Sequence, residues 1–191
     1  MTELKSSVMY DLLDVVSNIL LVNKIPHHLE AGTLLGFVRD KKIMDHDTDV
    51  DVSIYYDDWN VLTTIDFSKY GLVKCREDAR DTGFGRVLSL KFPHHSMYCD
   101  VYANPAFPLL APLTVKNKKG EEKTYNIPIK PEIYLFVLYG DWRTPSGKHA
   151  DWPKLYYNEL LTSAYKPYWD IKYKVLYNLH YSECELKMLS S

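Results

Sequence analysis

The sequence has few of the features that place a chain in a specialised class of protein. It has 3 cysteines, far apart and without a Cys-x-x-Cys pair, which argues against a disulfide framework and against a structural zinc site. Its 23 Lys and Arg residues do not outnumber its 25 Asp and Glu residues, so the basic excess typical of nucleic-acid-binding domains is missing. No apolar run approaches the roughly 20 residues of a membrane span, and no signal-peptide layout is present. We therefore expect a cytoplasmic protein without nucleic-acid partners; the sequence leaves peripheral membrane association open.

The 191 residues, 46% hydrophobic and 25% charged, are sufficient for one domain with a substantial core. Apolar periodicity and turn residues predict an α/β (α+β) fold, a mixed sheet flanked by helices and followed by a helical C-terminal part. The predicted helices cover residues 4–23, 33–40, 56–67, 131–140, 154–161 and 169–188, and the predicted strands cover 27–30, 48–55, 72–77, 85–92 and 96–103. A hairpin is predicted over 113–128. No Pro-, Gly- or Ser-rich linker divides the chain, so we expect a single domain over 1–191, with its core at about 1–110 and the helical part at about 128–191.

The stretch "DHDTDVDVSI" has an aspartate at every second position, Asp45, Asp47, Asp49 and Asp51. A calcium-binding EF-hand loop is excluded, because glycine and a bidentate glutamate are missing at the positions where that loop needs them. On a β-strand, alternate residues point to the same face. Two carboxylates aimed to one side can hold one or two Mg²⁺ or Mn²⁺ ions and share them with phosphate oxygens.

A third carboxylate is expected on a neighbouring strand. Asp100 is the lone acid among the apolar and aromatic residues of "MYCDVYA". Upstream, Gly32 and Thr33 form a turn at a helix start, where backbone N–H groups and a hydroxyl favour phosphate. A Gly–Thr turn, an Asp-x-Asp strand and a lone-Asp strand together are the arrangement of the nucleotidyltransferase fold. We therefore expect Asp49, Asp51 and Asp100 to be both the metal ligands and the catalytic residues.

The segment "HHLEAGTLLGFVRDKKIMDHDTDVDVSI" closely resembles the core of the LicD/fukutin family, which reads roughly GTLLGxxRxxxFIPWDDDIDI. The resemblance resumes at "MYCDVYA" and at "YNIPIKPEIYLFVLYGDWRTPS". It implies a nucleotidyltransferase-type sheet and the transfer of a phospho-alcohol, such as phosphocholine or ribitol phosphate, from a CDP-linked donor to a sugar hydroxyl of a glycan. Carried over by position, Asp49 and Asp51 are the metal pair and Asp100 is the third carboxylate. Gly32, Thr33 and Arg39 then belong to the donor side.

The sequence departs from the family pattern immediately before the metal pair. Asp45 and His46 replace the family's Pro–Trp, and Thr48 replaces the middle acid of its triplet. These departures put the choice of substrate in doubt more than the metal site, because Thr48 points away from the acidic face. Asp47 lies on that face but too early to reach the metal, so we expect it to support the ligands from outside the coordination sphere.

Charge suggests how the remaining residues act. Arg39 and Lys91 are candidate phosphate contacts, although each could also be a solvated surface cation. Asp100 is best placed to accept the proton of the attacking hydroxyl or to orient it. For the adjacent histidines His27 and His28 we expect surface or turn roles.

Two other functions remain open. The first is a nucleotidyltransferase that attaches CMP or AMP to a small molecule or protein. The second is a non-catalytic family member that binds a nucleotide or glycan.

Overall fold

The computed structural model describes residues 3–82, 85–104, 108–117, 120–139 and 141–145. By its contacts the chain divides into two compact units, Met1–Ile129 and Lys130–Ser191. The helices predicted over 154–161 and 169–188 lie outside the described residues. That the whole chain is one domain stays a prediction.

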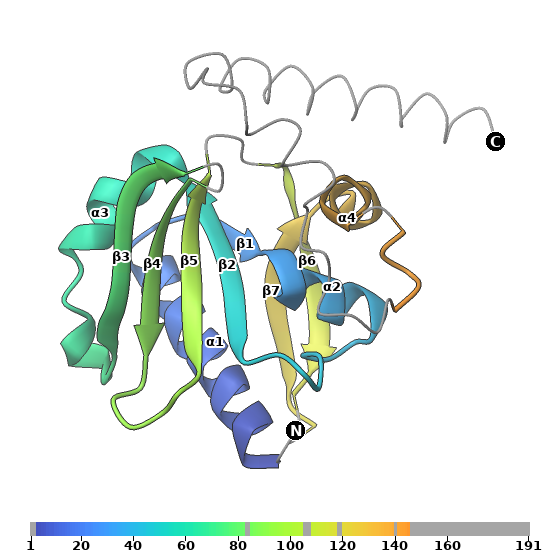
Figure 1. The fold of residues 1–191 in the computed structure, drawn as a ribbon, viewed down its shortest axis with the longest axis horizontal. Helices are drawn as coiled ribbons and strands as arrows, with labels where there is room; N and C mark the ends of the chain where they lie inside the picture. Colours follow the sequence, from blue (N-terminus) through green and yellow to red (C-terminus); the bar gives the residue numbers. More distant parts are fainter. Residues whose placement is uncertain (1–2, 83–84, 105–107, 118–119, 140, 146–191) are drawn as a thin grey trace. The chain divides into compact units, whose positions relative to one another are not determined.

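The first unit is built on a five-stranded sheet with the order β1-β2-β5-β4-β3 (Figure 1). The strands are β1 His27–Leu29, β2 Asp49–Tyr55, β3 Val73–Thr82, β4 Gly85–Lys91 and β5 Tyr98–Asn104. β2 and β5 run parallel, and the other neighbours pair antiparallel. The predicted meander of three strands is therefore confirmed, as is a mixed sheet in which the acidic strand and the lone-Asp strand are neighbours.

Helix α1, Glu3–Val22, covers one face of this sheet and packs against β2 and β5 (Figure 1). Its apolar residues recur at helical spacing, and the following are buried in the core: Met9, Leu12, Leu13, Val16, Ile19 and Leu20. On the strands, Val50, Val52 and Val101 are fully buried. Because side chains alternate along a strand, Asp49 and Asp51 face away from this apolar layer.

A second layer is formed by helix α2, Ala31–Arg39, and a hairpin of β6, Leu110–Lys116, and β7, Glu122–Pro128. β7 lies next to β1, and α2 lies against β2. Phe37 of α2 stacks on Tyr125 of β7, with 5.7 Å between ring centroids, and Tyr10 of α1 is tilted against Phe37 at 5.9 Å. The Tyr125 hydroxyl donates to Asp14 Oδ1 over 2.5 Å. These contacts join the hairpin to both helices.

Three local expectations differ from the structure. β3 runs to Thr82, through residues 78–82 that their turn-forming composition predicts to be a loop, because β4 supplies a pairing partner up to Gly85. β6 begins at Leu110, ahead of the hairpin predicted over 113–128; Pro112 is tolerated because the sheet has only two strands. The helix expected over 56–67 is instead a 3₁₀ turn, η1 Tyr56–Asp58, followed by α3 Trp59–Thr64 and a second 3₁₀ turn, η2 Phe67–Tyr70.

The described part of the second unit is one helix, α4 Pro131–Tyr139, with the residues that follow it. Pro131 is the first helical residue, a position where a missing N–H is tolerated. The Trp142 indole N–H donates to the Glu132 carbonyl over 3.1 Å and folds the following turn back onto the helix. Within the described residues, none of the helices has the length and apolar character needed to cross a bilayer.

Candidate active site

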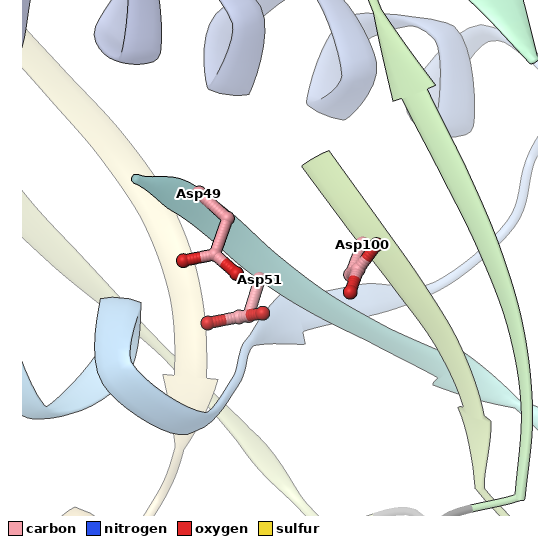
Figure 2. Close-up of side chains that lie close together, drawn as sticks. All are labelled: Asp49, Asp51 and Asp100. Carbon is pink, nitrogen blue, oxygen red and sulfur yellow. The ribbon is translucent and has the colours of Figure 1, made fainter. Parts of the chain in front are cut away.

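Asp49, Asp51 and Asp100 come together on the sheet face that points away from α1. Figure 2 shows the first two on β2 and the third on the adjacent β5. Each residue offers a carboxylate oxygen, and these atoms all lie within 4.8 Å of one another. Asp51 and Asp100 are buried, with 7% and 3% exposure, and Asp49 is half-buried. The sequence predicted this grouping, and the parallel pairing of β2 with β5 produces it.

Strand register sets the relative positions of the three acids. Asp51 lies directly opposite Asp100, while Asp49 lies opposite Tyr98. The main chain at Asp51 is held from both sides. Its N–H donates to Thr33 Oγ1 over 2.8 Å, and its carbonyl accepts from the Glu30 N–H over 3.0 Å. The start of α2 therefore anchors the middle of the acidic cluster through backbone bonds, and the Asp51 side chain projects into the site.

Burial and the charges of neighbouring acids both oppose ionisation of Asp49 and Asp51. Burial raises the pKa of Asp51 well above its usual value, and the charges of Asp49 and Asp100 raise it further. The pKa of Asp49 is also raised, first by burial and then by the charge of Asp100. Burial and the nearby charges of Asp51 and Asp100 raise the pKa of the Tyr102 phenol, so it stays protonated and can donate. A group of acids with raised pKa values that share one position is typical of a cation site.

Asp100 has three hydrogen-bond donors that the sequence did not point to. The Ser89 hydroxyl donates to Asp100 Oδ1. The Arg76 guanidinium forms an ion pair with Oδ2 at 2.9 Å, and the Tyr102 hydroxyl donates to the same oxygen over 3.3 Å. Ser89 and Arg76 come from β4 and β3, so only knowledge of the strand register could have grouped them with Asp100. Tyr102 lies two residues after Asp100 on β5, and alternation along the strand places it on the same face.

The start of α2 supplies the other expected neighbours of the cluster. A methyl group on Gly32 would lie 3.5 Å from Asp47 Oδ2 and 3.8 Å from Asp51 Oδ2, so glycine keeps this side open. Thr33 is fully buried beneath, with its hydroxyl on the Asp51 N–H. The N-cap residue Glu30 accepts from the Ala31 N–H over 3.1 Å. Gly32 and Asp47 therefore border the acids, and roles for Gly32 and Thr33 in donor binding stay predictions.

The two candidate cations lie further out. Arg39 ends α2 and forms a two-point ion pair with Asp40, at 2.9 and 2.8 Å, and it contacts Met44 Sδ at 3.2 Å. Lys91 ends β4, opposite Val73, and shares a sheet face with Ser89 two residues earlier. Lys91 thus lies on the side of the acids, and Arg39 is ion-paired with Asp40 directly after α2. Phosphate binding by either residue stays a prediction.

The expectation that His27 and His28 have surface or turn roles is wrong. Both lie on β1 and are buried, with 8% and 1% exposure. Burial lowers the pKa of His28 to about 4, so its ring is neutral at physiological pH. Its Nδ1 lies 2.8 Å from the Leu29 carbonyl. The local sequence could not reveal this burial, because it comes from strand and hairpin neighbours distant along the chain.

The composition of the cluster fits a hard divalent cation. Three carboxylates from two rigid strands supply oxygen ligands, which Mg²⁺ and Mn²⁺ prefer over nitrogen and sulfur. Cys75 and Cys99 are free thiols and are not members of the cluster. A cation between the acids would offset the repulsion that raises the pKa values of Asp49 and Asp51.

The mixed five-stranded sheet and its three acids are those expected of a nucleotidyltransferase-type domain. Residues 24–107 match the family model described as LicD/FKTN/FKRP, nucleotidyltransferase domain. The matched segment contains every residue expected in the site. The match confirms the resemblance to the LicD/fukutin family over this segment.

One curated relative covers most of the chain. The uncharacterized protein RP689 of Rickettsia prowazekii (strain Madrid E) is 26% identical over 182 residues, which is 92% of this chain and 60% of the relative. The chain therefore spans about three fifths of the length of that relative.

Two solved structures show a distant likeness at 12% identity. One is the lincomycin-bound lincosamide antibiotic adenylyltransferase LnuA, with a TM-score of 0.45 over 74% of this chain and 92% of that one. The other is the antibiotic-resistance factor ANT(2'')-Ia, with a TM-score of 0.42 over 97% and 100% of the two chains. At these scores the likeness carries no argument about this chain.

Proposed function

We propose that the protein is a metal-dependent phosphotransferase that moves a phospho-alcohol from a CDP-linked donor to a sugar hydroxyl of a glycan. The observation that carries this proposal is the meeting of Asp49, Asp51 and Asp100 within 4.8 Å, inside a segment that matches the LicD family. Phosphoryl transfer depends on positioning and on neutralisation of phosphate charge, and a carboxylate-bound divalent cation supplies both.

Each acid has a defined task in this proposal. Asp49 and Asp51 on β2 and Asp100 on the neighbouring β5 would hold Mg²⁺ or Mn²⁺. A cation held there would supply the positive charge that neutralises the donor pyrophosphate. Asp100 also orients the acceptor hydroxyl or takes its proton, with its own orientation held by Ser89 and Tyr102.

A second candidate is a true nucleotidyltransferase that attaches CMP or AMP to a small molecule or protein. The description of the matched domain supports it, because that description names nucleotidyl transfer. The two reactions differ in which group leaves phosphorus: CMP leaves in the first and pyrophosphate in the second. The same three acids serve both.

A thermal-shift panel tests the proposal. CDP-choline, CDP-ribitol, CDP-glycerol, CTP, ATP and UTP are each added with and without Mn²⁺. We expect CDP-alcohols to raise Tm only with Mn²⁺ and more than triphosphates do. A larger shift with CTP or ATP would favour nucleotidyl transfer, and a metal-independent shift would favour a non-catalytic binding protein. Asp49→Asn should lose the metal-dependent shift, whereas Asp57→Asn, at an exposed acid on η1, should keep it.

A further inference from the structure

Arg76 lies at one end of a polar row that crosses four strands of the sheet. Arg76 on β3 is opposite Ser89 on β4, Ser89 is opposite Asp100 on β5, and Asp100 is opposite Asp51 on β2. All four side chains therefore point to the sheet face that carries the acidic cluster. The guanidinium reaches Asp100 Oδ2 at 2.9 Å.

A β-bulge is what turns Arg76 toward the cluster. Lys74 pairs with Leu90 and Arg76 pairs with Ser89, so Cys75 is an extra residue between them. In a regular ladder Cys75 would take the place opposite Ser89, and Arg76 would point to the α1 face. The Cys75 thiol donates to the Ser89 carbonyl over 3.3 Å at the bulge. The bulge places the positively charged side chain of Arg76 beside the three acids.

The charge and exposure of Arg76 suit a temporary partner better than a structural one. Its side chain is 53% exposed, while that of Asp100 is 5% exposed. A half-exposed guanidinium has N–H groups left to meet a ligand from solvent, and it binds phosphate in a planar, two-point geometry. It also opposes a second cation at the same carboxylate.

We propose that Arg76 is a built-in counter-ion that makes metal binding depend on the phosphate-bearing donor. In the metal-free protein it neutralises Asp100 and weakens the affinity of the cluster for a divalent cation alone. When an anionic pyrophosphate arrives with the cation, the guanidinium turns from Asp100 to the phosphate oxygens. The carboxylates then compensate the charge of the divalent cation, and the pyrophosphate compensates the charge of the guanidinium. This inference rests on the proposed function, since it requires the three acids to bind metal.

Isothermal titration calorimetry with Mn²⁺, alone and in the presence of CDP, tests the proposal. For the wild-type protein we expect CDP to tighten Mn²⁺ binding by at least about tenfold, because the two ligands share the site. Arg76→Gln should bind Mn²⁺ alone at least ~5-fold more tightly than wild type, because a repelling charge is gone. Its enhancement by CDP should fall below about twofold. Arg76→Lys keeps the charge and should give intermediate values.

The matched control is Lys69→Gln, which removes one positive charge from an exposed side chain paired with Asp66. It should leave both Mn²⁺ affinities unchanged. A merely structural Arg76 would weaken metal binding when replaced, so an affinity for Mn²⁺ alone that is unchanged or lower in Arg76→Gln overturns the inference. If wild-type protein binds no Mn²⁺ with or without CDP, the proposed function fails instead.

Discussion

Replacing Asp51 with asparagine should stabilise the metal-free protein while it destroys the metal site. The Asp51 side chain is 7% exposed. Its carboxylate lies beside those of Asp49 and Asp100, and one carboxylate oxygen from each residue lies within 4.8 Å of the others. At that separation two ionised carboxylates repel by about 3 kcal/mol, taking an effective dielectric constant of about 20. Asparagine has nearly the same shape, and the hydrogen bonds of Asp51 to Thr33 and Glu30 are made by its main chain.

The expected gain is smaller than the sum of the pairwise repulsions, because Arg76 compensates the charge of Asp100. We expect Asp51→Asn to add about 2 kcal/mol to the free energy of unfolding at pH 8, or roughly 4 to 8 °C in Tm for a chain of this size. Differential scanning calorimetry without metal measures it. Asp57→Asn, at an exposed acid, should stay within about 0.5 kcal/mol of wild type.

The stability of the metal-free wild-type protein should fall as pH rises. Because the pKa values of Asp49 and Asp51 are raised by folding, the native state holds protons that the unfolded state has released. That stabilisation is full below the unfolded pKa near 3.9 and is lost as pH rises through the folded values. The advantage of Asp51→Asn should therefore grow from pH 5 to pH 8. A variant less stable than wild type at pH 8 without metal would refute the reasoning from charge repulsion.

Two further changes test how α2 supports the site. Thr33→Val removes the acceptor of the buried Asp51 N–H and should cost about 1 to 3 kcal/mol in urea unfolding, whereas Thr33→Ser should cost less than half of that; equal losses for both would contradict the hydrogen-bond explanation. Gly36→Ala should destabilise by about 1 to 3 kcal/mol, because its methyl group would lie 2.6 Å from the Lys42 carbonyl oxygen. Gly32→Ala, whose methyl group would have 3.5 Å of clearance, should be neutral or up to about 1 kcal/mol stabilising in thermal unfolding. A Gly32→Ala variant less stable than Gly36→Ala would contradict this account of packing at α2.

The acids of the site could be predicted because their positions depend on short-range rules. Alternation along a strand put Asp49 and Asp51 on one face, and a lone acid in an apolar strand singled out Asp100. The remaining step was the pairing of β2 with β5, which the order of motifs suggested and the register confirms.

The partners of Asp100 could not be predicted, for a physical reason. Arg76 faces the cluster only because of the bulge at Cys75, and Ser89 does so only in one register of β4. A slip of one residue would turn either side chain to the opposite face. The burial of His27 and His28 similarly depends on packing by segments far away in the chain, which local sequence patterns do not reveal.

In our account, Asp49, Asp51 and Asp100 together form one binding site for a divalent cation. The most direct measurement is the anomalous scattering of Mn²⁺ in crystals of the protein grown with MnCl₂ and CDP. An anomalous peak in contact with carboxylate oxygens of all three residues, absent from crystals of Asp51→Asn, is the predicted result. A peak at another position, or the same peak in both proteins, would contradict the claim.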